Sequence, residues 1–124
     1  MILQALGNIA LIHNIRGQYD KSLEIYKEVM ETAEDIHDLR AQAQTYGNIG
    51  IIYKNIANYD TAIKNWEEQL LIAKKIGDKH LKTRAYSGFA IANQKIGNFN
   101  QSIDYHNKNI KIKREINDQE GLAS

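Results

Sequence analysis

Apolar and small residues recur at helical spacing through the middle of the chain. In the segments 41–56 and 59–76 they fall three and four positions apart, which is the spacing of one face of an α-helix. The stripe of the first segment is Tyr46, Ile49, Gly50 and Tyr53, and that of the second is Ala62, Ile63, Trp66, Leu70 and Ala73. Each segment therefore predicts an amphipathic helix that needs a neighbour to cover its apolar face.

The same pattern returns every 40 residues. A shift by this period places Gly7-Asn8-Ile9 on Gly47-Asn48-Ile49, Tyr46 on Tyr86, and Tyr19-Asp20 on Tyr59-Asp60 and then on Phe99-Asn100. Three repeats therefore occupy about residues 1–40, 41–80 and 81–120, and residues 119–124 have the phase of a further first helix. Because one such unit cannot bury its apolar face alone, the repeats must stack. We expect a single array over residues 1–124 that is a slice of a longer one.

Short turns separate the predicted helices. Ala57-Asn58 replaces Gly17-Gln18 and Gly97-Asn98 at a position suited to a left-handed helix end. Asp60, like Asp20 and Asn100, is expected to accept hydrogen bonds from free amides at the start of the following helix. The expected turns between repeats are Ile36-His37-Asp38, Ile76-Gly77-Asp78 and Ile116-Asn117-Asp118. Each repeat is therefore predicted to be a pair of antiparallel helices.

The positions of the aromatic and small residues resemble the tetratricopeptide repeat. The signature positions hold Tyr46, Ile49-Gly50, Tyr53, Tyr59, Ala62 and Trp66 in the middle repeat, Leu6, Ile9-Ala10, His13, Tyr19, Ser22 and Tyr26 in the first, and Tyr86, Phe89-Ala90, Asn93, Phe99, Ser102 and His106 in the third. The long period resembles the variety found in Pins-type scaffolds and prokaryotic signalling proteins. This resemblance implies an all-α, right-handed α-solenoid of three helix-turn-helix repeats.

The resemblance also implies a concave groove lined by the first helix of each repeat. The ladder Leu11, Ile51 and Ile91 takes a position where many relatives have Asn, so we expect an apolar groove; the alternative is packing within or between repeats. Amide side chains in the flanking rows can pair with the main chain of an extended peptide, and Arg84 can hold a carboxylate. The flanking rows are Gln4, Gln44 and Arg84, then Asn8 and Asn48, then Asn14, Lys54, Asn55, Gln94 and Lys95. The carboxylate clamp of some relatives is incomplete because Gly88 replaces its third Asn, and a solvated polar face is the other interpretation.

The ladder Gly7, Gly47 and Ser87 needs a cause, because Gly inside a helix costs about 1 kcal/mol relative to Ala. Close approach of a ligand strand or of a neighbouring helix would each supply one. Trp66 is predicted to lie buried between both helices of its repeat and the next first helix. His13 and His106 stand at aromatic signature positions, where packing is the expected role.

Composition narrows the classes of function. The chain has no Cys and no Pro, and its four His residues lack metal-ligand spacing, so we expect no metal site and no cofactor. Nucleophile and phosphate-loop motifs are also absent, which argues against an enzyme. We expect neither a signal peptide nor a membrane-spanning segment, and a cytoplasmic location. A net charge of +1 and the lack of stacking aromatics beside the basic stretch of the last helix argue against nucleic acid.

These observations favour a protein–protein interaction module that acts as an adaptor or scaffold by binding a peptide segment of a partner. One alternative is a peptide-sensing regulatory domain of a larger signalling protein. Another is self-association through the uncapped ends. Residues 1–40 carry 4 Lys/Arg against 7 Asp/Glu and residues 81–124 carry 7 against 4, so the ends have opposite charge and could meet head to tail.

Overall fold

Six helices make up the described part of the chain, and that part contains no strand. The computed structural model describes residues 2–123, and the side chains of residues 3–119. The helices are α1 (Ile2–Ile15), α2 (Tyr19–Asp35), α3 (Leu39–Asn55), α4 (Tyr59–Ile76), α5 (Lys79–Ile96) and α6 (Phe99–Ala123). The predicted all-α solenoid of helix pairs is confirmed.

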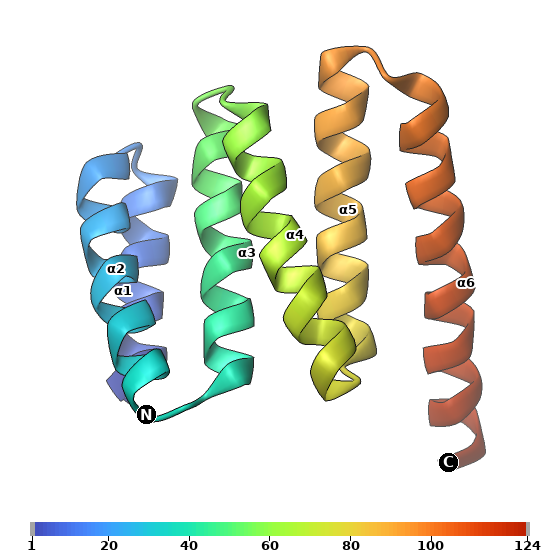
Figure 1. Cartoon of the computed structure of the whole chain (residues 1–124), viewed down its shortest axis with the longest axis horizontal. Helices are drawn as coiled ribbons and strands as arrows, with labels where there is room; N and C mark the ends of the chain where they lie inside the picture. Colours follow the sequence, from blue (N-terminus) through green and yellow to red (C-terminus); the bar gives the residue numbers. More distant parts are fainter. Residues whose placement is uncertain (1, 124) are drawn as a thin grey trace.

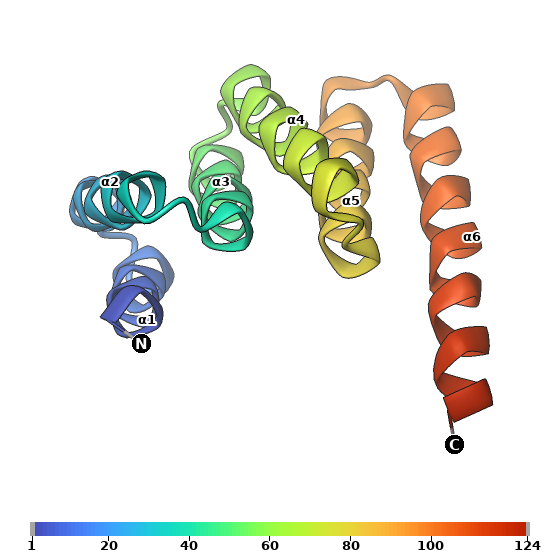
Figure 2. The same cartoon turned by 60° about the horizontal axis from the view of Figure 1, so that its bottom comes forward.

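The helix pairs follow one another in a row from the N-terminus at one end to the C-terminus at the other (Figure 1; Figure 2). Each helix packs on the next one along the chain, and α3 also contacts both α1 and α5. The core is accordingly divided into clusters at the helix junctions, rather than gathered in one centre. This arrangement leaves one side of α1, α3 and α5 free to form a continuous surface.

Trp66 joins three helices. Its side chain is 3% exposed and belongs to a cluster with Tyr86 and Phe89 of α5. The indole Nε1 donates a hydrogen bond to the Gly47 carbonyl at 3.2 Å. A Cβ atom at Gly50 of α3 or at Gly88 of α5 would overlap the indole ring, so both glycines permit the close approach of α4. The predicted burial of Trp66 is confirmed.

Close packing of a neighbouring helix explains why Gly is needed at one position of the glycine ladder, Gly47. A Cβ atom on Gly47 would overlap the amide of Gln69, which α4 projects between α3 and α5. At Gly7 no atom of another described helix lies within 4 Å of the place where a Cβ would stand. The first repeat therefore has open space where the second has a side chain.

The turns reach left-handed backbone conformations, as the sequence predicts. Gly17 and Gly97 have φ angles of 76° and 102°, and Ala57 takes the equivalent position with a φ of 63°. Between repeats, Gly77 has a φ of 69° and His37 has a φ of 57°. The left-handed position is thus taken by Gly in three of these turns and by Ala57 and His37 in the other two.

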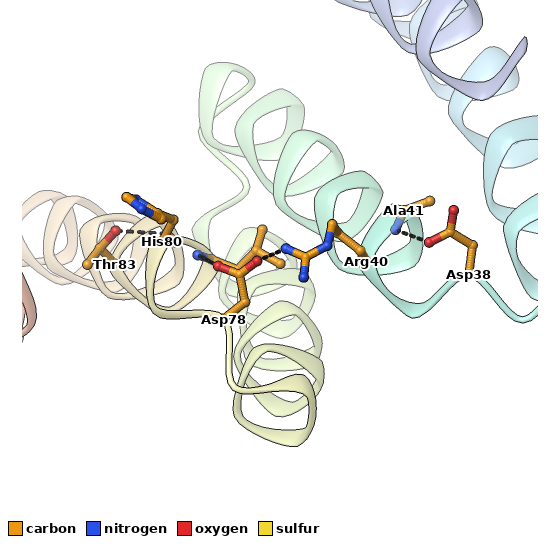
Figure 3. Close-up of polar contacts among 7 residues, drawn as sticks. Asp38, Arg40, Ala41, Asp78, His80 and Thr83 are labelled. Atoms are coloured by element: carbon orange, nitrogen blue, oxygen red, sulfur yellow. Dashed lines mark hydrogen bonds and ion pairs between the residues drawn. The ribbon is translucent and has the colours of Figure 1, made fainter. Parts of the chain in front are cut away.

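Polar side chains begin the helices. Asp38 and Asp78 accept hydrogen bonds from the backbone N–H groups of Ala41 and Leu81, both at 3.0 Å, as expected for the turns between repeats. Figure 3 shows that Asp78 also pairs with Arg40 from the start of α3. Each Asp thus fixes where its helix starts, and Asp78 additionally ties two consecutive first helices together.

The expected cap at Asp60 is wrong. Asn58 precedes α4 and accepts from the backbone N–H of Thr61 at 3.3 Å, while Asp60 lies inside the first turn. The shift arises because the helix begins at the aromatic residue, Tyr59, whose side chain packs on the core. Asp20 lies likewise inside the first turn of α2.

The turn expected at Ile116-Asn117-Asp118 is also not formed, since α6 continues through it to Ala123. Residues 119–123 therefore continue α6 instead of starting a further helix, and Ser124 lies outside the described residues. In the first repeat His37 adopts its left-handed conformation with α3 packed behind it. Asn117 replaces Gly77, and no described helix follows α6, so continued helix is the lower-energy choice here.

Candidate peptide-binding groove

A first hollow lies between α1 and α3, with α2 beneath it. It has a volume of about 840 Å³. Amide side chains stand around its rim: Gln4, Asn8, Gln44 and Asn48. Leu11 adds an aliphatic wall and is 42% exposed. The first hollow thus offers both amide hydrogen-bonding groups and an apolar surface.

A second hollow lies between α3 and α5, with α4 beneath it. Its volume is about 190 Å³. Ile51 and Ile91 form aliphatic walls, while Lys54 and Arg84 bring positive charge to the rim. Arg84 Nη2 donates to Asn48 Oδ1 at 3.2 Å, so its guanidinium connects the two hollows.

The two hollows are built from equivalent positions. A shift by 40 relates six lining residues of the first hollow to six of the nine that line the second: Gly7 and Gly47, Leu11 and Ile51, Tyr26 and Trp66, Val29 and Gln69, Gln44 and Arg84, Asn48 and Gly88. They are therefore successive sections of one surface, which we call the groove. The groove arises because stacking of the repeats brings equivalent positions of successive helices side by side.

Each hollow contains a buried polar group that has no hydrogen-bond partner among the described residues. Tyr26 is 1% exposed in the first hollow, and its hydroxyl has no partner. Gln69 is 0% exposed in the second hollow, and neither Nε2 nor Oε1 has one. Buried polar atoms in proteins are nearly always paired, so an unpaired group on the floor of a hollow indicates a place for a ligand atom or water.

Electrostatics differ between the two hollows. Burial raises the pKa of the Tyr26 hydroxyl, and the positive charge of Arg84 partly offsets this rise. The hydroxyl is therefore neutral and can donate or accept a hydrogen bond. The second hollow carries two cations and no anion among its lining residues. This end of the groove favours a carboxylate.

The structure brings most of the candidate site residues together. The first hollow is lined by Gln4, Asn8, Leu11, Gln44 and Asn48, and the second by Ile51, Lys54, Arg84 and Ile91. Asn14 and Asn55 lie outside both hollows, and Asn14, which is 6% exposed, accepts a hydrogen bond from Asn55 at 3.1 Å. Gln94 and Lys95 are exposed on α5 and line neither hollow.

Sequence reasoning missed the floor of the groove. Tyr26, Val29 and Gln69 reach it from the second helices, whereas only first helices were expected to line it. A signal was present for Gln69, since it places an amide in an apolar stripe that has Val at the equivalent position of the first repeat. Trp66 was assigned to the core and in fact serves both core and groove.

Comparison with protein families gives one match in two overlapping parts. The model of the tetratricopeptide repeat matches residues 1–59 and again residues 42–115. Comparison with curated proteins gives no match. In the part of the chain described by the structure, no helix is long and apolar enough to cross a membrane.

Proposed function

Because the chain belongs to the tetratricopeptide repeat family, whose non-catalytic repeats generally mediate protein–protein interaction, we propose that it binds a peptide segment of a partner protein in the groove. The observation that carries this proposal is the repeated hollow with an unpaired polar group at its floor. In this role the chain is an adaptor or scaffold that holds a partner without changing it chemically.

The two hollows select different parts of such a peptide. Amides around the first hollow can donate to and accept from the main chain of an extended segment. The second hollow has the size of one side chain and carries Lys54 and Arg84 beside two isoleucines. An aliphatic residue next to an acidic one fits that combination.

Spacing of the helices sets the spacing of the anchors. Packed helices lie about 8–10 Å apart, so consecutive hollows are separated by about that distance. An extended polyproline II chain advances about 3.1 Å per residue and returns to the same side every third residue. The anchoring side chains of a bound peptide are therefore expected three positions apart.

The experiment is a selection of short random peptides displayed on phage, followed by titration of the purified peptides. Trp66 is the single tryptophan of the chain and lines the second hollow, so its fluorescence reports filling of the groove. We expect enriched peptides to share an aliphatic–acidic pair and to change the emission of Trp66. Enrichment of no sequence above background contradicts the proposal.

The double substitution Ile51→Asp with Ile91→Asp is expected to abolish peptide binding while leaving the helical circular dichroism signal intact. Ile51 also packs on the cluster around Trp66, so unfolding of this variant would assign Ile51 to the core. Arg84→Glu provides a second variant on an exposed residue, with an expected affinity loss of about tenfold or more. Leu71→Asp, on the exposed surface of α4 and outside both hollows, is the matched control. Unchanged affinity in both groove variants contradicts the proposal.

A further inference from the structure

Glycines inside the first helices of the second and third repeats each receive a planar side chain. A Cβ atom on Gly50 of α3 or on Gly88 of α5 would overlap the indole ring of Trp66. A Cβ atom on Gly47 of α3 would overlap the carboxamide of Gln69. In this chain, a glycine inside these first helices therefore lets a flat group lie directly against the helix backbone.

Gly7 occupies the position of Gly47 in the first repeat, but no side chain of another described helix packs on it. The difference arises on the second helix of the repeat. Val29 of α2 takes the position of Gln69 of α4, and it has no carboxamide that could fill the space. Both Gly7 and Val29 line the first hollow, which lies between α1, α2 and α3, so the unfilled space opens into the groove.

The hydroxyl of Tyr26 adds an unpaired polar group to the same hollow. Tyr26 takes the position of Trp66, whose Nε1 donates to the Gly47 carbonyl at 3.2 Å. Tyr26 itself is 1% exposed, and its hydroxyl has no hydrogen-bond partner among the described residues. Because Tyr26 and Gly7 line one hollow, an atom bound in that hollow can supply the partner that a buried hydroxyl normally has.

The other residues of the first hollow favour a neutral ligand. Leu11 and Val29 provide aliphatic surface. Among the residues that line this hollow only Asp38 is charged, and its carboxylate already accepts a hydrogen bond from the backbone N–H of Ala41. An anionic group would find no opposite charge among these lining residues, in contrast to the second hollow with its two cations. A flat, largely apolar group with one polar atom matches these walls.

We propose that the first hollow is a socket for an aromatic ring with one hydrogen-bonding atom, the side chain of a tyrosine or tryptophan. The ring lies on the backbone at Gly7 and against Val29, and its polar atom pairs with the hydroxyl of Tyr26. This inference rests on the proposed function for the source of the ring, which is a residue of the bound peptide. That residue is expected three positions from the aliphatic residue in the second hollow.

The test uses p-cresol, which is the tyrosine side chain as a free molecule, and toluene, which has the same ring without the hydroxyl. Each is titrated into the ¹⁵N-labelled chain, and binding is followed by NMR at the backbone N–H of Gly7. We expect p-cresol to cause saturable shifts there. Toluene should bind about threefold to tenfold more weakly, as expected for the loss of one hydrogen bond.

Three variants probe the socket, and a fourth is the control. Gly7→Leu places a side chain in the open space, and Val29→Gln introduces the carboxamide that fills it in the second repeat; each should weaken p-cresol binding at least about tenfold. Tyr26→Phe should bind p-cresol and toluene equally, because the unpaired hydroxyl is gone. Ala5→Leu, at an exposed position of α1 outside the hollow, should bind like the original chain. Far-UV circular dichroism verifies that each variant is folded.

Absence of a saturable shift at Gly7, or undiminished p-cresol binding by the Gly7→Leu variant, overturns the socket. So does a Tyr26→Phe variant that still prefers p-cresol to toluene. Selected peptides that change Trp66 emission but bind the Gly7→Leu variant with full affinity overturn the socket alone and support peptide binding in the groove. Enrichment of no peptide, together with the expected p-cresol binding, overturns the peptide as the source of the ring and supports the socket.

Discussion

At the residue scale, Gln69 stands out because it is fully buried and yet its amide has no hydrogen-bond partner in the part of the chain that the structure describes. Its counterparts behave differently: Val29 has no polar group to satisfy, and the amide of Asn109 lies 2.8 Å from the Ser87 hydroxyl. An unpaired buried polar group costs about 1–3 kcal/mol, so the amide is expected to find a partner in a bound ligand atom or a water. The cost is consistent with a role in ligand binding.

Replacing Gln69 by Met, which has a similar volume and no polar hydrogen-bonding demand, is expected to stabilise the chain by about 1 kcal/mol. The same change should weaken binding of a selected peptide, because the floor of the second hollow loses its amide. Urea unfolding measures the first effect and Trp66 fluorescence titration the second. Asn109→Leu is the control and should lose stability, since it breaks the contact with Ser87. A less stable Gln69→Met variant would show that the amide has a structural partner, such as a bound water.

Burial of the Tyr26 hydroxyl makes stability depend on pH at the alkaline end. Its pKa is raised in the folded chain above its ordinary value of 10.0, so the folded state disfavours the phenolate. The contribution of this neutral hydroxyl to the free energy of unfolding is fully present below the ordinary pKa, and it is lost as the pH rises through the raised pKa of the folded chain. We expect Tyr26→Phe to reduce the alkaline loss in urea unfolding measured from neutral pH upward. A loss of the same size in both chains would assign it to other groups, for example Tyr46, whose pKa is raised as well.

Ala57 adopts a left-handed conformation that is unfavourable for alanine, whereas Gly adopts it freely at the equivalent positions. Its φ of 63° costs an L-residue roughly 1–2 kcal/mol, while Gly loses about 0.5–1 kcal/mol in chain entropy. Ala57→Gly should therefore raise stability by up to about 1 kcal/mol. The reciprocal change Gly97→Ala, at a φ of 102°, should lower it. Thermal unfolding of both variants tests the pair, and changes of the same sign would contradict this account.

Among single residues, burial of Trp66 was predictable because the aromatic signature places it beside small residues on both neighbouring first helices. The isolation of Gln69 was not predictable, because it depends on which atoms come near the amide once the helices have packed. His106 was expected to be a core or half-buried packing residue, and this expectation is wrong, since His106 is exposed. Its position is buried only where a further first helix covers it.

At the element scale, helix starts depend on which residue immediately precedes the helix. The sequence predicted the Asp38 and Asp78 caps, because each Asp follows a clear turn. It placed the start of α4 correctly at Tyr59 but misplaced the cap by two residues, since Asn58 and Asp60 are both good caps and only packing of the intervening Tyr59 decides between them. The extension of α6 was missed for a related reason: local sequence signals a turn at Asn117, but the turn needs a following helix to hold it.

Asp78 and Asp38 form a matched pair for measuring what ties consecutive repeats together. Both cap a helix, but only Asp78 also binds Arg40, whose side chain is 57% exposed. Asp38→Ala should cost about 1 kcal/mol for the lost cap. Asp78→Ala should cost slightly more, because an exposed ion pair adds at most about 1 kcal/mol. Arg40→Ala isolates the contribution of the ion pair. In urea unfolding, the loss of stability caused by Asp78→Ala and by Arg40→Ala should depend on salt concentration, whereas the loss caused by Asp38→Ala should not.

At the scale of the whole molecule, one position of the repeat is covered in the first two repeats and exposed in the third. Tyr26, Trp66 and His106 are equivalent by the shift of 40 residues, and they are 1% exposed, 3% exposed and exposed, respectively. The first two lie under the next first helix, and the third has no described helix after it. The stability of the row therefore resides in its junctions, as expected for a one-dimensional array.

The loss of stability on alanine substitution at these three positions should follow how deeply the side chain is buried, rather than its residue type. Trp66→Ala and Tyr26→Ala are expected to cost about 3–5 kcal/mol each, since truncating a buried aromatic leaves a cavity. Trp66→Ala should be the more disruptive in hydrogen exchange, because it loosens α3, α4 and α5 together. His106→Ala should change stability by less than about 0.5 kcal/mol in dilute solution, as for an ordinary surface site. A large loss of stability in the His106→Ala variant would mean that α6 packs differently from the arrangement described above.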